Sequence, residues 1–233
     1  MPNKPHRILS TKILSSGLQA IATNAGIVLD MQEFIDITLL AAPEVETMMA
    51  SIPAQALVIF TSANAAKAVA ATGFHRPQWQ IACLEGATRD VVLTHFSDAQ
   101  IVLTAVDATT LSEVLLQREG LHEVYFFCGD QRRDTIPLRL QAAGINIQEL
   151  IVYFNTATPA LTTGIYDAVL FFSPTAVKSF FSVNTLPVHT TCFAIGPTTG
   201  AALQAHTTNH TISSDNPSAA TLLHMAIDHL DNL

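Results

Sequence analysis

The sequence predicts an α/β protein with two Rossmann-like parallel-sheet domains, one of them discontinuous, joined by a two-stranded β-ladder hinge. Three observations support this fold class. Short apolar runs alternate with helical segments, which is typical of parallel sheets with crossover helices. An internal repeat relates the middle of the chain to its C-terminal part. The strands that the second copy lacks have counterparts at the N-terminus.

The repeat is clearest between residues 58–67 (VIFTSANAAK) and residues 169–178 (VLFFSPTAVK). Val, Phe, Ser, Ala and Lys coincide there at an offset of 111 residues, as from position 58 to position 169. The same offset aligns Thr88 with Thr199 and continues toward the C-terminus without a gap. A single offset held over separate segments indicates duplication of one α/β unit.

The middle of the chain contains five apolar runs with the continuous apolar character expected of strands covered on both faces. These strands are expected at residues 57–61, 80–84, 100–104, 124–128 and 145–148. The helices between and after them are expected at residues 64–71, 88–96, 109–118 and 134–143. The last helix is followed by Gly144, a common residue just past a helix end.

The second copy is shorter and takes its remaining elements from the N-terminus. Its strands are expected at residues 169–172, 191–195 and 211–213, followed by a helix at residues 218–230. The N-terminal elements are expected at residues 7–11, 16–24 and 26–29. One domain is therefore predicted from residues 1–32 plus 160–233, and the other from residues 41–148.

Two β-rich segments must connect these domains. Residues 33–40 and 149–159 are each closed by a proline, Pro43 and Pro159, and are expected to pair as hinge strands. Such a hinge permits opening and closing around a ligand. We expect the working surface to lie in the cleft between the domains.

Composition excludes several classes of function. The net charge is −8 and no cluster of Lys and Arg extends beyond the pair Arg132–Arg133, which argues against a nucleic-acid partner. No stretch approaches the roughly 20 apolar residues of a membrane span, and the N-terminal residues contain no apolar signal-peptide core, so a cytoplasmic protein is expected. Cys83, Cys128 and Cys192 are interpreted as reduced, buried thiols, and the His and Cys spacings predict no metal site.

Three strand-to-helix junctions are rich in hydroxyl groups, and ligands of open parallel sheets bind at such junctions. They are residues 61–64 (TSAN), 173–175 (SPT) and 196–199 (GPTT). Each one alone is better explained by ordinary helix capping. Together they favour an anion site, because backbone N–H groups and the helix dipole bind carboxylates without basic side chains.

Two further features leave alternatives open. The arginines of residues 128–134 (CGDQRRD) are suited to clamping a carboxylate, but they equally fit solvated residues of a first helical turn. Tyr153 lies in a predicted crossing strand, where a tyrosine is more often a packing residue than a catalyst.

Five segments together resemble the uroporphyrinogen-III synthase family, in that family's order and spacing. They are residues 60–64 (FTSAN), 129–134 (GDQRRD), 151–156 (IVYFNT), 171–177 (FFSPTAV) and 194–199 (AIGPTT). The resemblance implies two Rossmann-like domains joined by a β-ladder and a monomeric, cytoplasmic lyase that uses no cofactor or metal. Its substrate would be hydroxymethylbilane, cyclised with inversion of ring D to uroporphyrinogen III and water.

The resemblance also implies roles for particular residues. Tyr153 matches a tyrosine that is a candidate to assist departure of the substrate hydroxyl. The expected substrate-binding residues are Lys12, Thr61, Ser62, Asn64, Arg132, Ser173, Thr175, Gly196, Thr198 and Thr199. Two positions depart from the family pattern. Lys12 stands where many members carry Arg, and Glu85 stands at the position duplicated by Gly196, where a glycine is usual.

A different class of function remains as the alternative, namely a non-catalytic hinged binding or regulatory domain for an anionic metabolite. A nucleotide-dependent enzyme of Rossmann type is disfavoured, because the chain has neither a GxGxxG nor a GxxxxGK[ST] motif.

Overall fold

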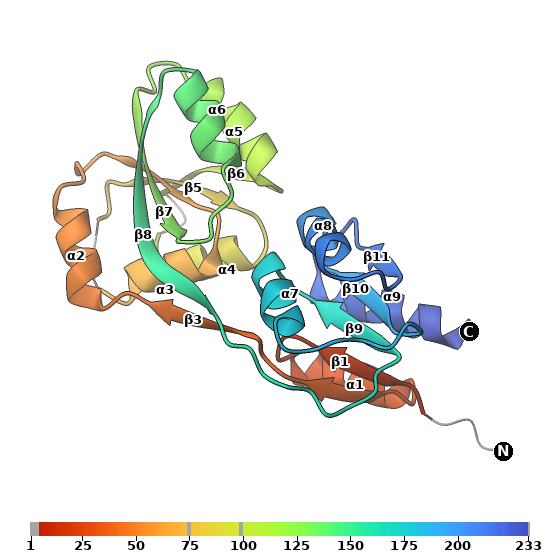
Figure 1. The fold of residues 1–233 in the computed structure, drawn as a ribbon. Coiled ribbons are helices and arrows are strands. Elements are labelled where there is room, and N and C mark those ends of the chain that lie inside the picture. The colour runs from red at the N-terminus through yellow and green to blue at the C-terminus, as the bar shows by residue number, and fades with distance from the viewer. Residues whose placement is uncertain (1–4, 74–75, 98–99, 233) are drawn as a thin grey trace. The chain divides into compact units, whose positions relative to one another are not determined.

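The computed structural model describes residues 5–73, 76–97 and 100–232 of the chain (Figure 1). The chain divides into two compact units. The first unit contains the residues up to Asp36 together with those from Thr156 onward, and the second contains Ile37–Asn155. Each unit is an α/β layer structure around a largely parallel sheet, so the predicted fold class is confirmed.

The sheet of the first unit is built from both ends of the chain. Its strand order is β11-β10-β9-β1-β2, and every neighbouring pair is parallel. The strands are β1 (Arg7–Ser10), β2 (Val28–Met31), β9 (Ala168–Phe171), β10 (Thr191–Ala194) and β11 (Thr211–Ser213). The N-terminal strand β1 lies beside β9, with Ile8 opposite Ala168 (Figure 1).

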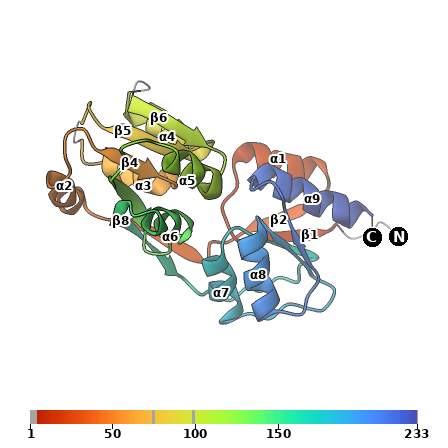
Figure 2. The ribbon, with the colours of Figure 1, turned by 90° about the horizontal axis from the view of Figure 1, so that it is seen from above.

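Helices cover both faces of this sheet, which explains the continuous apolar character of its strands. The helices are α1 (Ser16–Asn24), α7 (Pro174–Phe181), α8 (Pro197–His206) and α9 (Ala219–Asp231). Figure 2 shows α1 beside α9 and α7 beside α8, as separate pairs. Ile8 packs in the core with α1 and α9, whereas the next residue, Leu9, packs in the core with α7 and α8.

The second unit has a six-stranded sheet of order β3-β8-β7-β4-β5-β6. The strands are β3 (Ile35–Leu39), β4 (Leu57–Phe60), β5 (Gln80–Leu84), β6 (Ile101–Ala105), β7 (Glu123–Gly129) and β8 (Asn146–Ala157). The helices are α2 (Ala42–Ala50), α3 (Ala63–Ala70), α4 (Ala87–His95), α5 (Ala108–Leu116) and α6 (Thr135–Ala142). The first three helices pack on one face of the sheet, and α5 and α6 pack on the other.

The two connecting strands pair with each other, as the sequence predicts. Strands β3 and β8 are neighbours, and two hydrogen bonds at the ends of the pair show its direction. The backbone N–H of Leu40 donates to the carbonyl of Val152 at 2.9 Å, and that of Thr158 donates to the carbonyl of Phe34 at 3.0 Å. These contacts run in opposite directions along the two segments, so the pair is antiparallel. The boundaries between the units fall inside both strands.

Three local expectations are corrected. Helix α2 is missing from the predicted elements, because Pro43 was interpreted as closing a strand but lies in the first turn of this helix. The segments expected at residues 145–148 and 149–159 form one continuous strand, β8, which ends at Ala157. Strand β2 begins at Val28 rather than at Gly26, because Gly26 has φ +71° and belongs to the turn after α1.

The three cysteines are buried and free, as expected, and burial raises the pKa of the Cys192 thiol to about 12. Within the described ranges, none of the helices has the length and apolar character to span a membrane.

Candidate active site

A β-bulge determines where Tyr153 points in the second unit. In the β7–β8 pair, Cys128 lies opposite Ile151 and Gly129 lies opposite Tyr153, so Val152 is an extra residue in β8. Both Val152 and Tyr153 consequently pack against the core on the side of α3. Bulges commonly re-aim a side chain in this way at functional sites.

The phenol of Tyr153 forms a hydrogen bond with Ser62, the N-cap residue of α3. The Ser62 Oγ in turn accepts a hydrogen bond from the backbone N–H of Asn64 at 3.2 Å. Burial raises the pKa of the Tyr153 phenol above its usual value of about 10, and the Ser62 hydrogen bond partly opposes this shift. The phenol is therefore protonated at neutral pH, beside the positive end of a helix dipole.

Two other predicted residues lie at the same junction. Thr61 follows β4 directly and Asn64 lies in the first turn of α3, and both are half-buried. Since β8, β7 and β4 are neighbours in the sheet, the structure brings Thr61, Ser62, Asn64 and Tyr153 together at one edge of the second unit.

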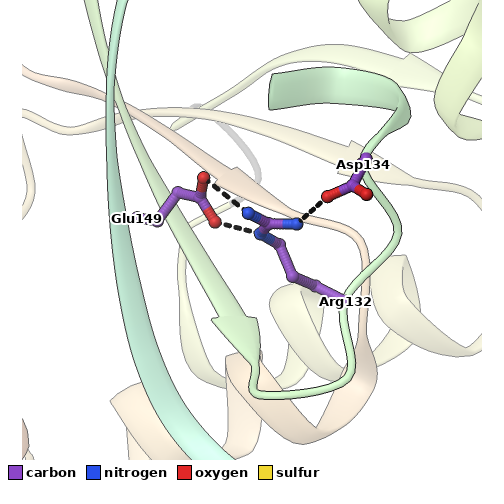
Figure 3. Close-up of polar contacts among 3 residues, drawn as sticks. All are labelled: Arg132, Asp134 and Glu149. Carbon is purple, nitrogen blue, oxygen red and sulfur yellow. Dashed lines mark hydrogen bonds and ion pairs between the residues drawn. The ribbon is translucent and has the colours of Figure 1, made fainter. Parts of the chain in front are cut away.

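Arg132 is held by two carboxylates of its own unit (Figure 3). Its Nε and one Nη form a fork with Glu149 of β8, the second contact measuring 2.8 Å, and its other Nη pairs with Asp134. Neither of the two sequence interpretations describes this arrangement. Contact between Arg132 and a substrate carboxylate stays a prediction, because these contacts use three of the five N–H donors of the guanidinium.

We expect Arg132→Ala to lower the free energy of unfolding by about 1.5–3 kcal/mol, because Glu149 would lose a charge-assisted, two-point partner. Urea denaturation followed by circular dichroism measures this change. Exposed Arg133 is the matched control, and its replacement by Ala should change stability by no more than about 0.5 kcal/mol. A raised KM for Arg132→Ala without any loss of stability would contradict a structural role.

In the first unit, the predicted residues follow three neighbouring strands. Lys12 comes after β1, Ser173 caps α7 after β9, and Gly196 precedes α8 after β10. The Ser173 Oγ accepts a hydrogen bond from the backbone N–H of Ala176 at 3.1 Å. The Lys12 ammonium lies 5.9 Å from the ring centroid of Phe172. The carboxyl ends of parallel strands share one edge, so these groups gather at that edge.

The three threonine candidates of this edge differ in accessibility. Thr198 is exposed and Thr175 is half-buried, whereas Thr199 is only 2% exposed. Of the adjacent pair in α8, Thr198 is therefore accessible from solvent and Thr199 packs inward.

The sequence alignment places Glu85 opposite Gly196, but in the structure the residue equivalent to Gly196 at the start of the helix is Gly86. Gly86, with φ +71°, is the N-cap of α4, and Glu85 is an exposed residue before it. A glycine therefore caps both duplicated helices, although Gly86 and Gly196 are 110 residues apart. The buried pair Thr88 and Thr199 keeps the offset of 111.

Two cavities lie away from these edges. One of about 400 Å³ is lined by the first residues of strands in the second unit, Leu57, Gln80 and Glu123, and so lies at the opposite edge of the sheet. Another, of about 420 Å³, adjoins the C-terminal end of α8 in the first unit. No group of three or more His, Cys, Asp or Glu side chains is placed to hold a metal ion in the part of the chain that the structure describes.

Gly129 and Asp130 were given no individual role by the sequence, although both lie in the GDQRRD segment. In the structure both contact Tyr153 directly. The sequence pointed to Gly129 and Asp130 only through their position at the end of the strand that pairs with the one carrying Tyr153.

These features define a two-unit α/β protein whose sheets carry hydroxyl-rich helix N-termini at their carboxyl edges. The family model described as uroporphyrinogen-III synthase HemD matches residues 33–224. The chain belongs to this family, and it is accordingly an enzyme, a cyclising lyase of tetrapyrrole biosynthesis.

Solved structures agree with this assignment at the level of the fold. A mutant uroporphyrinogen III synthase from the extremely thermophilic bacterium Thermus thermophilus is 15% identical with a TM-score of 0.67, covering 98% of this chain and 100% of that chain. Uroporphyrinogen-III synthetase from Helicobacter pylori is 16% identical with a TM-score of 0.67, covering 96% and 99% of the two chains. None of the curated protein sequences compared with the chain matches it.

Proposed function

We propose that the chain converts hydroxymethylbilane into uroporphyrinogen III and water, with Tyr153 as the acid that assists departure of the hydroxyl group. The observation that carries this assignment is the protonated, half-buried phenol of Tyr153, which is hydrogen-bonded to Ser62 at the N-terminus of α3. The proposed action is in the cytoplasm and as a monomer, as the family resemblance implies.

The reaction begins with loss of the hydroxyl group from the linear tetrapyrrole. The Tyr153 phenol donates a proton to the departing oxygen, which leaves as water, and the substrate becomes an azafulvene cation. The phenolate that develops accepts the hydrogen bond of Ser62 and lies near the positive end of the α3 dipole.

The later steps rearrange carbon–carbon bonds within the substrate and end with the loss of a proton. The substituted carbon of ring D attacks the electrophilic azafulvene carbon, and the new carbon–carbon bond gives a spiro intermediate. This intermediate fragments and recloses with ring D inverted, and loss of a proton, which restores the Tyr153 phenol, gives the product. Since no change of oxidation state is involved, the main demand on the protein is to hold the substrate in one folded conformation.

The substrate carries acetate and propionate groups, although the protein has a net charge of −8. We assign their binding to the N-termini of α3, α7 and α8 and to Lys12. Backbone N–H groups at these helix starts have no partner within the helix and attract anions. The hydroxyl of exposed Thr198 adds a donor at the start of α8.

A coupled assay tests this function. Hydroxymethylbilane is generated in situ with and without the protein, and the oxidised products are resolved as isomers I and III. We expect isomer III to predominate, and Thr198→Ala to raise KM by roughly tenfold because one hydrogen bond to a carboxylate is lost. Thr208→Ala, at an exposed position of the same unit beyond the end of α8, is the control and should leave KM unchanged.

Isomer I is the product of spontaneous cyclisation. If isomer I alone forms in the presence of the protein, the proposed activity is wrong. Saturable binding of the linear tetrapyrrole in the same samples would then favour the alternative, a binding domain for an anionic metabolite.

A further inference from the structure

Asp130, the first residue after β7, forms hydrogen bonds to β8 at Tyr153 and just beyond it. The backbone N–H of Asp130 donates to the carbonyl of Tyr153 at 3.2 Å, which continues the β7–β8 ladder by one residue. The Asp130 Oδ1 then accepts the backbone N–H of Asn155 at 2.8 Å. A carboxylate oxygen thus takes the place of the next carbonyl of the ladder, and Asp130 contacts β8 on both sides of Phe154.

The ring of Tyr153 lies directly against the backbone of Gly129. A Cβ atom at position 129 would overlap Cε2 and Cζ of the ring and would lie 2.8 Å from the phenol oxygen. Gly129 is not among the glycines with positive φ, so the requirement here is for space and not for an unusual conformation. The ring is therefore fixed by Gly129 along its edge and by Ser62 at its hydroxyl group.

We propose that Asp130 is the positioning residue for Tyr153, because its carboxylate fixes β8 at Asn155 and so holds the phenol between Gly129 and Ser62. This inference rests on the proposed role of Tyr153 as the acid. The hydrogen bond to the Asp130 carboxylate is made by Asn155, the last residue of the second unit, and the chain enters the first unit at Thr156. Without the Asp130 carboxylate, β8 would keep the backbone contact at Tyr153 but would lose the hydrogen bond at Asn155 that follows it.

The charge of Asp130 is consistent with this arrangement. Partial burial tends to raise its pKa, but the hydrogen bonds from the Gln131 side chain and from the Asn155 backbone outweigh it, so the pKa lies below its usual value. The group is therefore ionised throughout the neutral range. Burial is the main cause of the raised pKa of Tyr153, and the negative charge of Asp130 adds to it.

Fluorine NMR tests the position of the ring independently of activity. The protein has three tyrosines, and 3-fluorotyrosine labelling gives each a resonance, of which the one lost in Tyr153→Phe belongs to Tyr153. Asp130→Ala should shift and broaden that resonance and leave the other two unchanged. Asp130→Asn keeps an acceptor oxygen and should retain the wild-type line, whereas Asp130→Ser is too short to reach Asn155 and should behave like Asp130→Ala.

Asp107→Ala is the matched control. The Asp107 carboxylate also accepts a backbone N–H, that of Thr110 at 2.8 Å, but it caps α5 on the other face of the same unit. Its removal should leave the Tyr153 resonance in place. An unchanged Tyr153 line in both Asp130→Ala and Asp130→Ser would overturn the proposal, and the serine and asparagine variants decide the question if the alanine variant does not fold.

Steady-state kinetics of the Asp130 variants provide the second test of the proposal. Asp130→Ala should lower kcat by roughly tenfold with KM unchanged, and it should cause no further loss in a Tyr153→Phe background, because residues that act as a unit are not additive. Losses that multiply in the double variant would show that Asp130 acts by another route. If no variant, wild type included, makes isomer III, the proposed function fails, while the NMR arm still decides whether Asp130 positions the ring.

Discussion

Replacing Tyr153 with phenylalanine is expected to lower kcat by roughly 10- to 100-fold and to leave KM within about twofold of the wild-type value. General acids typically contribute about 10²- to 10⁴-fold, and a phenol with a pKa of about 10 or more lies at the lower end of that range or below it. The ring itself remains, so its packing on Gly129 and the shape of the site are kept. Initial rates of isomer III formation give both constants.

Tyr125→Phe is the control for this experiment. The Tyr125 phenol is also buried and also has a raised pKa, about 12, but it donates to Glu123 at the opposite edge of the same sheet. Its loss should leave kcat unchanged. Equal kcat values for Tyr153→Phe and the wild type would remove the phenol from the mechanism. Because burial raises the pKa of Tyr153, we also expect no loss of rate from its titration between about pH 7 and 9.

The largest effect on stability is expected for Phe60→Ala, with a loss of about 3–5 kcal/mol in the free energy of unfolding of the second unit. Phe60 is fully buried in β4 and its ring stacks on Phe127 at a centroid distance of 5.3 Å. Truncation leaves a cavity beneath the junction that carries Thr61 and Ser62. Hydrogen exchange read by mass spectrometry locates the loss of protection along the chain.

The internal repeat provides a paired variant. Phe171 occupies the duplicated position in β9 and is also fully buried, so Phe171→Ala should cost a similar amount but reduce protection in the first unit. Phe154 is 43% exposed, and its replacement by Ala should have a much smaller effect on either unit. Retained protection of β4, β5 and β7 in Phe60→Ala would contradict the assignment of Phe60 to the core of the second unit.

Most of the fold could be predicted because apolar runs covered on both faces are visible in the sequence without tertiary information. Strand β5 has the predicted limits, Gln80–Leu84, and helix α1 has the predicted limits, Ser16–Asn24. Helix α2 was missed because a proline can either end a strand or begin a helix. The 12-residue strand β8 was divided in two because its pairing with β3 and β7 extends it across a segment that looks like a connection.

The candidate site was predictable to the extent that parallel sheets fix where ligands bind. Ser62 and Ser173 are helix N-caps after central strands, which their sequence context indicates. The pairing of Arg132 with Glu149, 17 residues later, depends on the register of β7 against β8. The contact of Tyr153 with Gly129 depends on a one-residue bulge in that register. Neither follows from residue types or spacing.

The interleaving of the two units has a consequence for the order of events during synthesis of the chain. Strand β1 occupies an interior position of its sheet, yet its neighbour β9 is made about 160 residues later, as the pairing of Ile8 with Ala168 shows. All six strands of the other sheet have been made by Ala157. The second unit can therefore complete its sheet while the edge of β1 that pairs with β9 is still unpaired. The N-terminal segment must remain available, and protected from wrong pairing, until the last third of the protein emerges.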